Sequence, residues 1–222
     1  MNANMRHFEA AIFDMDGLLL DSEKLALNAF LATCKKFSLG DLSDLFKQIV
    51  GTNPELGRSI LQEGLQGLAD HHEFHSIWDS AYLKLSQDKP IPLKKGVKEL
   101  LNHIESQNMP MAVATSSITE RARGKLHDSG ILKFFDLVVG GDQVSHSKPD
   151  PEIYLLAAAE LTVDATKCIG FEDSPNGVKS AVAAGLTVIQ VPDLIDPDED
   201  LLKLGHTVLG SLAEVEKFGS FN

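Results

Sequence analysis

The stretch FEAAIFDMDGLLLD, at residues 8–21, decides the fold of this chain. It opens with an apolar run at residues 10–13, and two carboxylates, Asp14 and Asp16, follow before a turn at Gly17. A short apolar run that ends at a turn is typical of a strand buried on both faces of a parallel sheet. Ligands of open α/β sheets bind just beyond the carboxyl ends of such strands. We therefore expect both aspartates at the site of chemistry, where their repulsion requires a cation or a shared proton.

The composition argues against several classes of protein. The 222 residues suffice for one large or two modest domains. With 20 basic and 32 acidic residues the net charge is -12, which argues against nucleic acid or an anionic membrane as a partner. No apolar run approaches the roughly 18 residues that span a bilayer, and residues 1–10 lack the apolar core of a signal peptide. Cys34 and Cys168 lack CxxC spacing, so we expect buried thiols in a reducing cytoplasm.

Helical periodicity follows the first strand as far as a two-proline linker at residues 89–92. Apolar side chains recur at helical spacing within residues 27–34, 42–49, 61–68 and 74–85. Asp21 and Ser22 suit an N-terminal cap for the first of these helices. Phe74, Trp78 and Tyr82 follow one helix face, which favours a packed core over a ligand-binding cage. No strand pattern interrupts this region, so we predict a helical bundle over residues 21–92.

Strand and helix patterns alternate beyond the linker. Strands are predicted at residues 111–114, 136–139, 168–171 and 187–191, with helices at 97–104, 153–161 and 178–184 and another that ends at Gly130. This alternation predicts an α/β fold with a parallel sheet covered by helices. We assign residues 1–20 and 93–222 to this core domain and residues 21–92 to an inserted helical domain. The acidic run at residues 193–200 is expected to be a solvated loop.

Polar groups follow the ends of four predicted strands. They are Asp14 and Asp16, then Thr115, Ser116 and Ser117, then Lys148 in the segment SHSKPDP, and finally Glu172 and Asp173. In a parallel sheet, the carboxyl ends of all strands meet at one edge, so we expect these groups to converge.

In this order, and over the whole chain, the four motifs resemble those of the haloacid dehalogenase superfamily of phosphohydrolases. DxDG alone occurs often by chance, but the ordered set is specific. The helical insertion resembles the helical cap of that superfamily's first subclass. DMDGLLLDSE, SKPDP and GFEDSPNGVKSAVAAG are similar to the branch that contains β-phosphoglucomutase and small sugar-phosphate phosphatases. The resemblance implies a Rossmann-like core with an α-helical bundle cap, acting on a small phosphorylated metabolite as a monomer or weak homodimer.

The resemblance also implies a role for each polar residue. Asp14 is the nucleophile and forms an aspartyl-phosphate. Asp16 is the general acid for the leaving alcohol and then the base for the attacking water. Thr115 and the amide of Ser116 hold the transferring phosphoryl oxygens, and Ser117 joins Ser116 in binding the substrate.

The balance of charge at this edge predicts a metal. Asp14, Asp16, Glu172 and Asp173 bring four negative charges, and a phosphoryl group adds roughly two more. Lys148 supplies one positive charge and offsets part of the phosphoryl charge. A divalent cation is therefore needed, and ligands that are all oxygen select Mg²⁺. By resemblance, the carboxylates of Asp14, Glu172 and Asp173 and the backbone carbonyl of Asp16 hold it.

Each motif also has a purely structural interpretation. Residues 14–17 could form a turn after a strand, and residues 115–117 could cap a helix. Lys148 could be a solvated loop lysine, and residues 172–175 could be a capped helix start with proline at its first position. All of these interpretations would have to hold together, in order and each at a strand end, so we favour an enzyme.

Departures from the mutases of this branch favour a phosphatase. Ala26, Pro54 and Ile118 stand where the resemblance places a histidine, an arginine and a lysine of the β-phosphoglucomutases. Arg58 lies one turn beyond Pro54, and with Asn53 it is a candidate contact for the leaving group of the substrate. We expect hydrolysis of a monophosphate; a phosphosugar mutase and a non-catalytic phosphate-binding domain are the alternatives.

Overall fold

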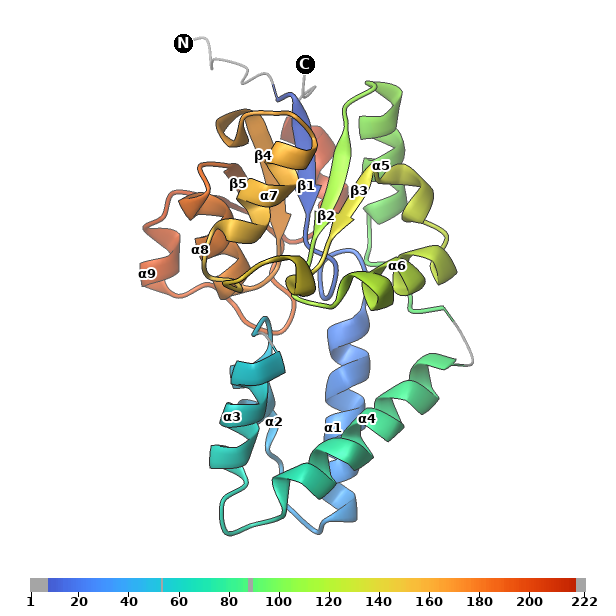
Figure 1. Ribbon diagram of the computed structural model, residues 1–222, viewed down its shortest axis with the longest axis vertical. Coiled ribbons are helices and arrows are strands. Elements are labelled where there is room, and N and C mark those ends of the chain that lie inside the picture. Colours follow the sequence, from blue (N-terminus) through green and yellow to red (C-terminus); the bar gives the residue numbers. More distant parts are fainter. Residues whose placement is uncertain (1–7, 53, 88–89, 219–222) are drawn as a thin grey trace.

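Six parallel strands form one sheet (Figure 1). The computed structural model describes residues 8–52, 54–87 and 90–218. The strands are β1 (Ala10–Phe13), β2 (Met111–Ala114), β3 (Leu137–Val139), β4 (Cys168–Glu172), β5 (Thr187–Gln190) and β6 (Thr207–Val208). Their order is β3-β2-β1-β4-β5-β6, and every neighbouring pair is parallel. In this doubly wound order the strand sequence reverses between β1 and β4, which places a ligand crevice at their carboxyl ends.

Alternate residues of β1 belong to different hydrophobic layers. Ala11 and Phe13 pack in the layer that contains α5 (Val97–Ser106) and α6 (Thr119–Asp128). Ala10 and Ile12 pack in the layer that contains α7 (Glu152–Glu160) and α8 (Pro175–Ala183). Because successive side chains of a strand point to opposite faces, helices cover both faces of the sheet. This double burial explains why the strand reads as an uninterrupted apolar run.

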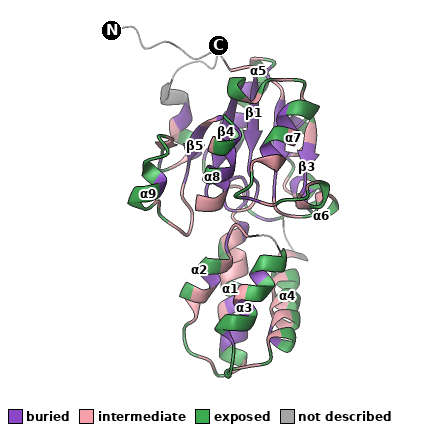
Figure 2. Cartoon of the chain, turned by 60° about the vertical axis from the view of Figure 1, so that its left-hand side comes forward, coloured by how far each residue is buried: buried purple, intermediate pink, exposed green. Residues whose placement is uncertain are grey.

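Four helices between β1 and α5 form a separate bundle, here called the helical insert. They are α1 (Ser22–Lys36), α2 (Ser43–Ile49), α3 (Pro54–Gly64) and α4 (His71–Gln87). Its own hydrophobic core contains Phe30, Phe46 and Phe74, all buried. Figures 1 and 2 show the insert facing the carboxyl edge of the sheet. Leu194 and Ile195, from the segment after β5, also pack against this core.

Two chain crossings connect the helical insert to the sheet, and they pair with each other. Leu20 and Leu93 form an antiparallel bridge. The backbone N–H of Asp21 donates to the carbonyl of Pro92 at 2.8 Å, and that of Lys94 donates to the carbonyl of Leu19 at 3.0 Å. The connection between the two parts of the molecule is therefore a narrow, hydrogen-bonded pair of strands.

The structure confirms the α/β fold and the helix and strand order predicted from the sequence, with a few differences at the boundaries. β3 begins at Leu137, one residue later than predicted, and Leu68 lies beyond the end of α3 and is exposed. The prediction missed β6, which has two residues, and α9 (Glu199–Leu202). Short 3-10 helices lie at Leu132–Phe134, Gly141–Gln143, Ala165–Lys167 and Leu212–Phe218. Cys34 and Cys168 are buried free thiols, as expected. In the described ranges, no helix is both long and apolar enough to cross a membrane.

Two interpretations of acidic residues were wrong. Asp193 is not in a solvated loop, because its side chain is only 3% exposed and forms an ion pair with Lys94. The end of the acidic run, Glu199 and Asp200, belongs to α9, which the exposed Asp198 caps by accepting from the N–H of Leu201. Asp21 precedes α1 but makes no capping hydrogen bond. Its carboxylate instead lies 3.4 Å from Lys24 Nζ, where a charge pair replaces the cap.

Candidate active site

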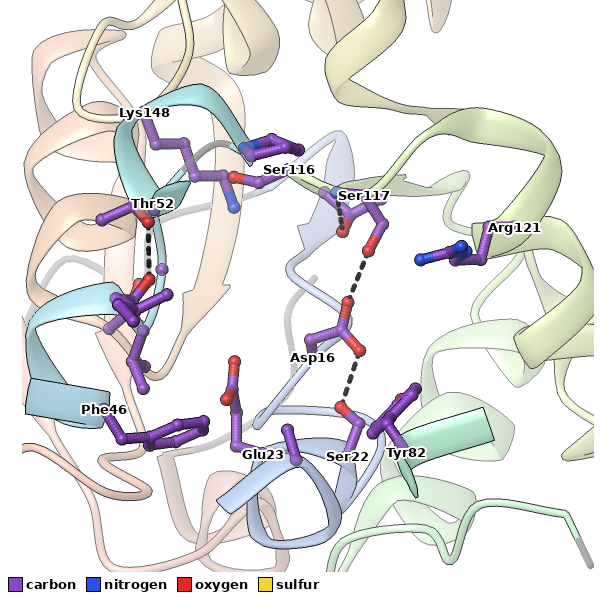
Figure 3. Close-up of a pocket in the computed structure, with 18 of the residues that line it drawn as sticks. Asp16, Ser22, Glu23, Phe46, Thr52, Tyr82, Ser116, Ser117, Arg121 and Lys148 are labelled. Carbon is purple, nitrogen blue, oxygen red and sulfur yellow. Dashed lines mark hydrogen bonds between the residues drawn. The ribbon is translucent and has the colours of Figure 1, made fainter. Parts of the chain in front are cut away.

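A cavity of about 510 Å³ lies between the carboxyl edge of the sheet and the helical insert (Figure 3). Most of the polar residues predicted from the strand ends line it: Asp14, Asp16, Thr115, Ser116, Ser117, Lys148 and Asp173. Glu172 lies behind this lining and is completely buried. From the helical insert, Arg58 reaches the cavity, as do Ala26 and Pro54. Asn53 falls outside the described residues.

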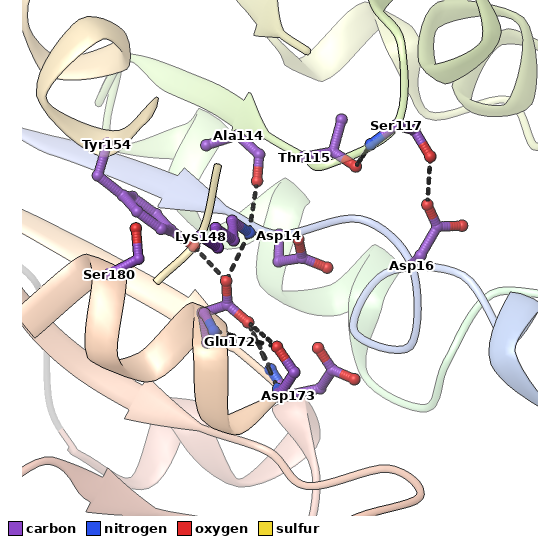
Figure 4. Close-up of polar contacts among 12 residues, drawn as sticks. Asp14, Asp16, Ala114, Thr115, Ser117, Lys148, Tyr154, Glu172, Asp173 and Ser180 are labelled. Carbon is purple, nitrogen blue, oxygen red and sulfur yellow. Dashed lines mark hydrogen bonds and ion pairs between the residues drawn. The ribbon is translucent and has the colours of Figure 1, made fainter. Parts of the chain in front are cut away.

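Lys148 is the centre of a buried hydrogen-bond network (Figure 4). Its ammonium donates to Oδ1 of Asp14 at 2.6 Å, to Oε1 of Glu172 at 2.6 Å and to the carbonyl of Ala114 at 3.0 Å. These bonds use all three donors of an ammonium group. Tyr154 donates its hydroxyl to the same Oε1 of Glu172 at 2.6 Å. At 4% exposure, Lys148 is not a solvated loop lysine.

Three carboxylates gather beside this network. Asp14, Glu172 and Asp173 each offer one oxygen, and these oxygens lie within 4.8 Å of one another. Burial raises the pKa of Asp14 to about 7, and the ammonium of Lys148 offsets this only in part. Burial, with the charges of Asp14 and Glu172, holds the pKa of Asp173 well above its ordinary value. A hard cation would relieve this repulsion, because every side-chain donor is oxygen. Elsewhere in the described chain, no three metal-ligating side chains lie so close.

Asp16 has a separate set of donors. Ser22 Oγ and Lys125 Nζ donate to its Oδ1 at 2.6 and 2.7 Å, and Ser117 Oγ donates to its Oδ2 at 2.9 Å. Burial disfavours its charged form, but the charge of Lys125 and the hydroxyl donors outweigh burial and lower the pKa of Asp16. The two carboxylates therefore do not contact the same positively charged side chain. Each has its own lysine, Lys148 for Asp14 and Lys125 for Asp16.

Sequence reasoning missed several residues that line the cavity, among them Lys125, Glu23 and Tyr82. Lys125 belongs to α6, which carries none of the four motifs. Glu23, in the first turn of α1, points into the cavity (Figure 3), and burial, reinforced by the charge of Asp16, raises the pKa of Glu23 to about 8. Tyr82 was predicted in the core of the insert but lines the cavity. Phe74, on the same helix face, is buried in that core, while Trp78 packs against the core and also lines the cavity, so spacing alone could not separate these roles.

The structural interpretations of the other motifs are partly correct. Residues 14–17 do form a turn, since Gly17 has a φ of +89°. Ser174 does cap α8, with its hydroxyl accepting from the N–H of Gly177 at 3.2 Å and Pro175 following it. Residues 115–117 do not cap α6, because Ile118 occupies that position without a capping bond. Turn and cap thus fix the backbone at two strand ends, and the side chains there remain directed at the cavity.

Comparison with known proteins agrees with this geometry. The model of the family of haloacid dehalogenase-like hydrolases matches residues 11–191. A phosphorylated carbohydrates phosphatase from Thermotoga maritima is 34% identical over 212 residues, covering 93% of this chain and 96% of that protein. A fructose-1-phosphate phosphatase from Escherichia coli is 30% identical over 186 residues, which cover 83% of this chain and 96% of that protein. Among solved structures, CbbY from Rhodobacter sphaeroides in complex with phosphate has a TM-score of 0.75 at 26% identity, covering 94% of this chain and 96% of the other.

Proposed function

The chain belongs to the family of haloacid dehalogenase-like hydrolases, and from this premise we propose a metal-dependent phosphatase. It hydrolyses a small phosphorylated metabolite, such as a sugar phosphate, through an aspartyl-phosphate on Asp14. The main support is the position of Asp14, which ends the central strand β1 and opens onto the cavity. The relatives named as phosphatases of phosphorylated carbohydrates and of fructose 1-phosphate support the substrate class.

The carboxylate of Asp14 would attack phosphorus through its second oxygen. Lys148 engages its Oδ1, and within the described ranges no hydrogen bond engages its Oδ2. Oδ2 would form the new bond to phosphorus while the bond from phosphorus to the leaving alcohol breaks. Lys148 would also offset charge on the transferring group, with Thr115 and Ser116 holding its oxygens and Ser117 beside them.

Asp16 would move the protons. In the first step Asp16 must be in its protonated form, which the charge of Lys125 disfavours, and it gives that proton to the departing alkoxide. In the second, its carboxylate takes a proton from the water that attacks phosphorus, and the bond between Asp14 and phosphorus breaks to release phosphate. The same side chain thus ends each cycle in the protonation state in which it began.

We propose Mg²⁺ as the metal. Asp14, Asp173 and the carbonyl of Asp16 would hold it. Glu172 is the third carboxylate of the acidic cluster and lies behind the lining of the cavity. Both oxygens of Glu172 already accept hydrogen bonds, from Lys148 and Tyr154 on one and from the N–H of Asp173 at 3.1 Å on the other. Glu172 would therefore act mainly by orienting Asp173 and Lys148. When bound, the ion supplies positive charge to the phosphoryl oxygens.

The helical insert, residues 21–92, would act as a cap over a core of residues 1–20 and 93–222. The paired crossings at Leu20 and Leu93 suit a hinge, and closure would exclude water from the cavity. Arg58 lines the cavity and would contact the leaving group, and Asn53 is proposed for the same role from its place in the sequence. The buried free thiols of Cys34 and Cys168 fit a reducing compartment, so we propose a cytoplasmic enzyme.

The lining of the cavity favours hydrolysis over a mutase reaction. Ala26, Pro54 and Ile118 line it in place of the three polar side chains of the mutases, and none of these three can bind a phosphate by charge, although Arg58 and Arg121 also line the cavity. A non-catalytic phosphate-binding domain is disfavoured because both Asp14 and Asp16 are present and directed at the site.

A phosphate-release screen tests the function. The panel contains phosphorylated sugars, nucleotides and organic acids, together with p-nitrophenyl phosphate, each with Mg²⁺ and with a chelator. We expect turnover of at least one sugar phosphate with Mg²⁺, loss with chelator, and no turnover by a folded Asp14→Asn variant. Full activity of Asp14→Asn, or no phosphate release from any member of the panel, would overturn the proposal.

A further inference from the structure

Lys125 forms an ion pair with Asp16 that none of the motifs predicted. Its ammonium lies 2.7 Å from Oδ1 of Asp16, and its side chain is only 15% exposed. The lysine comes from α6, which follows the strand that carries Thr115 at its end. One strand–helix unit therefore supplies both a candidate phosphoryl ligand and the charged partner of the candidate acid and base.

The contacts of Asp16 fix the orientation of its carboxylate. Ser22 comes from the helical insert, Ser117 from the segment after β2, and Lys125 from α6. Lys125 is the charged member of this set, and hydrogen bonds to charged partners are the stronger ones. Tyr82, on α4 of the insert, has its ring centroid 5.7 Å from Nζ of Lys125, close enough for a cation–π contact. Lys125 is thus held between Asp16 and the insert.

We propose that Lys125 is a positioning residue that aligns Asp16 for proton transfer in both steps of the reaction. This inference rests on the proposed phosphatase function. Lys125 acts through Asp16, because the atom it contacts is a carboxylate oxygen of that residue. Without Lys125, Ser22 and Ser117 would still bond Asp16, but no charge would draw Oδ1 toward α6.

A structural role alone would give a different kinetic result. A lysine that only stabilised the fold would lower the activity toward all substrates equally. Alignment of an acid matters most for a poor leaving group, because an alkoxide must be protonated as it departs. p-Nitrophenolate departs without a proton, so its release in the first turnover tests the step that does not need Asp16 as an acid.

The experiment compares Lys125→Met with Lys125→Arg, Asp16→Asn and a matched control, Lys167→Met. Lys167 forms an ion pair of similar length, 2.6 Å with Glu9, at an exposed place. For the best sugar phosphate, we expect Lys125→Met to lower kcat by about 10- to 100-fold with little change in KM. Lys125→Arg should recover most of this loss, because it keeps a charged donor, and Lys167→Met should match the wild type.

p-Nitrophenyl phosphate provides the second readout. Lys125→Met should release about one p-nitrophenol per enzyme in a rapid burst and then turn over slowly, as Asp16→Asn should, because attack by water still needs the base. Wild-type kcat in Lys125→Met, or an equal slowing of the first turnover for both substrates, would overturn the inference. If Lys125→Met does not fold, Lys125→Gln takes its place with the same expectations. Failure of the wild-type enzyme on every substrate would instead refute the phosphatase itself.

Discussion

The missing side chain of Gly17 leaves the space that the carboxylate of Asp173 occupies across the two central strands. A β-carbon on Gly17 would overlap Oδ2 of Asp173 and lie 3.0 Å from its Cγ. Gly17 also has a φ of +89°, which glycine adopts readily and other residues do not. The turn after β1 therefore supports the carboxylate that follows β4. The glycine of the DxDG motif thus has two roles: it allows the positive φ of the turn, and it leaves space for the carboxylate of Asp173.

Gly17→Ala should weaken metal binding as well as the fold. The added methyl group must displace Asp173, and loss of such support typically lowers metal affinity by about 10- to 100-fold. Gly130→Ala is the matched control, because Gly130 has a φ of +72° but open space around its missing β-carbon. The measurement is the Mg²⁺ concentration at half-maximal phosphate release, with the melting temperature alongside. Equal Mg²⁺ requirements in the two variants would contradict the proposed role of Asp173.

Lys148→Met should destabilise the protein and abolish turnover. It leaves Asp14 and Glu172 buried without their cation, and breaking a buried pair costs about 3–5 kcal/mol. The free energy of unfolding, from urea denaturation, measures the loss. Lys167→Met removes an exposed pair and should change stability by less than about 1 kcal/mol. Similar values for the two variants would mean that the network around Lys148 contributes little to the fold.

The parts of the site that could be predicted from sequence lie at strand ends. Asp14, Thr115 and Asp173 each follow an apolar run, and parallel strands bring their carboxyl ends to one edge. Chain order and strand polarity were therefore enough to place them together. Lys148 could be placed from its motif, but its complete burial depends on the three acceptors that surround it in the folded protein.

The parts that could not be predicted lie on helices. Lys125, Glu23 and Tyr82 follow the same spacing as ordinary surface or core residues, and only the packing of the insert against the sheet directs them at one cavity. Asp193 illustrates the same limit, because its partner Lys94 is distant in sequence. β6 was missed because two residues carry too little periodicity to identify a strand.

Glu23 should make the metal-free protein less stable at alkaline pH. Its pKa rises from 4.5 to about 8 in the folded state. Its stabilising contribution is therefore fully present below about pH 4.5 and is lost as the pH rises through 8. Glu23→Gln stays neutral, so its stability should equal that of the wild type near pH 4 and exceed it by a growing margin as the pH rises from 4.5 to about 8. Urea denaturation in the presence of chelator measures the free energy of unfolding of the wild type and of Glu23→Gln at each pH.

Glu120→Gln is the control for this comparison. Glu120 also lies in the first turn of a helix, but it is exposed. Glu120→Gln should follow the wild-type dependence on pH throughout. If the stability of Glu23→Gln also follows the wild-type dependence on pH, the carboxyl group of Glu23 is already ionised in the folded protein at neutral pH.

Protons should compete with Mg²⁺ for the acidic cluster. Burial raises the pKa of Asp14 to about 7 before metal binds, and Asp173 is shifted in the same direction. A cation binds the deprotonated carboxylates, so binding between pH 6 and 7 must release protons, and the apparent Kd should rise as the pH falls. Isothermal titration calorimetry in buffers of different ionisation enthalpy counts these protons. Asp14→Asn removes one competing carboxyl group and should release fewer protons per Mg²⁺ bound. An apparent Kd that stays constant from pH 8 to 6 would show that Asp14 and Asp173 are already ionised in the metal-free protein, and that Lys148 offsets their burial fully.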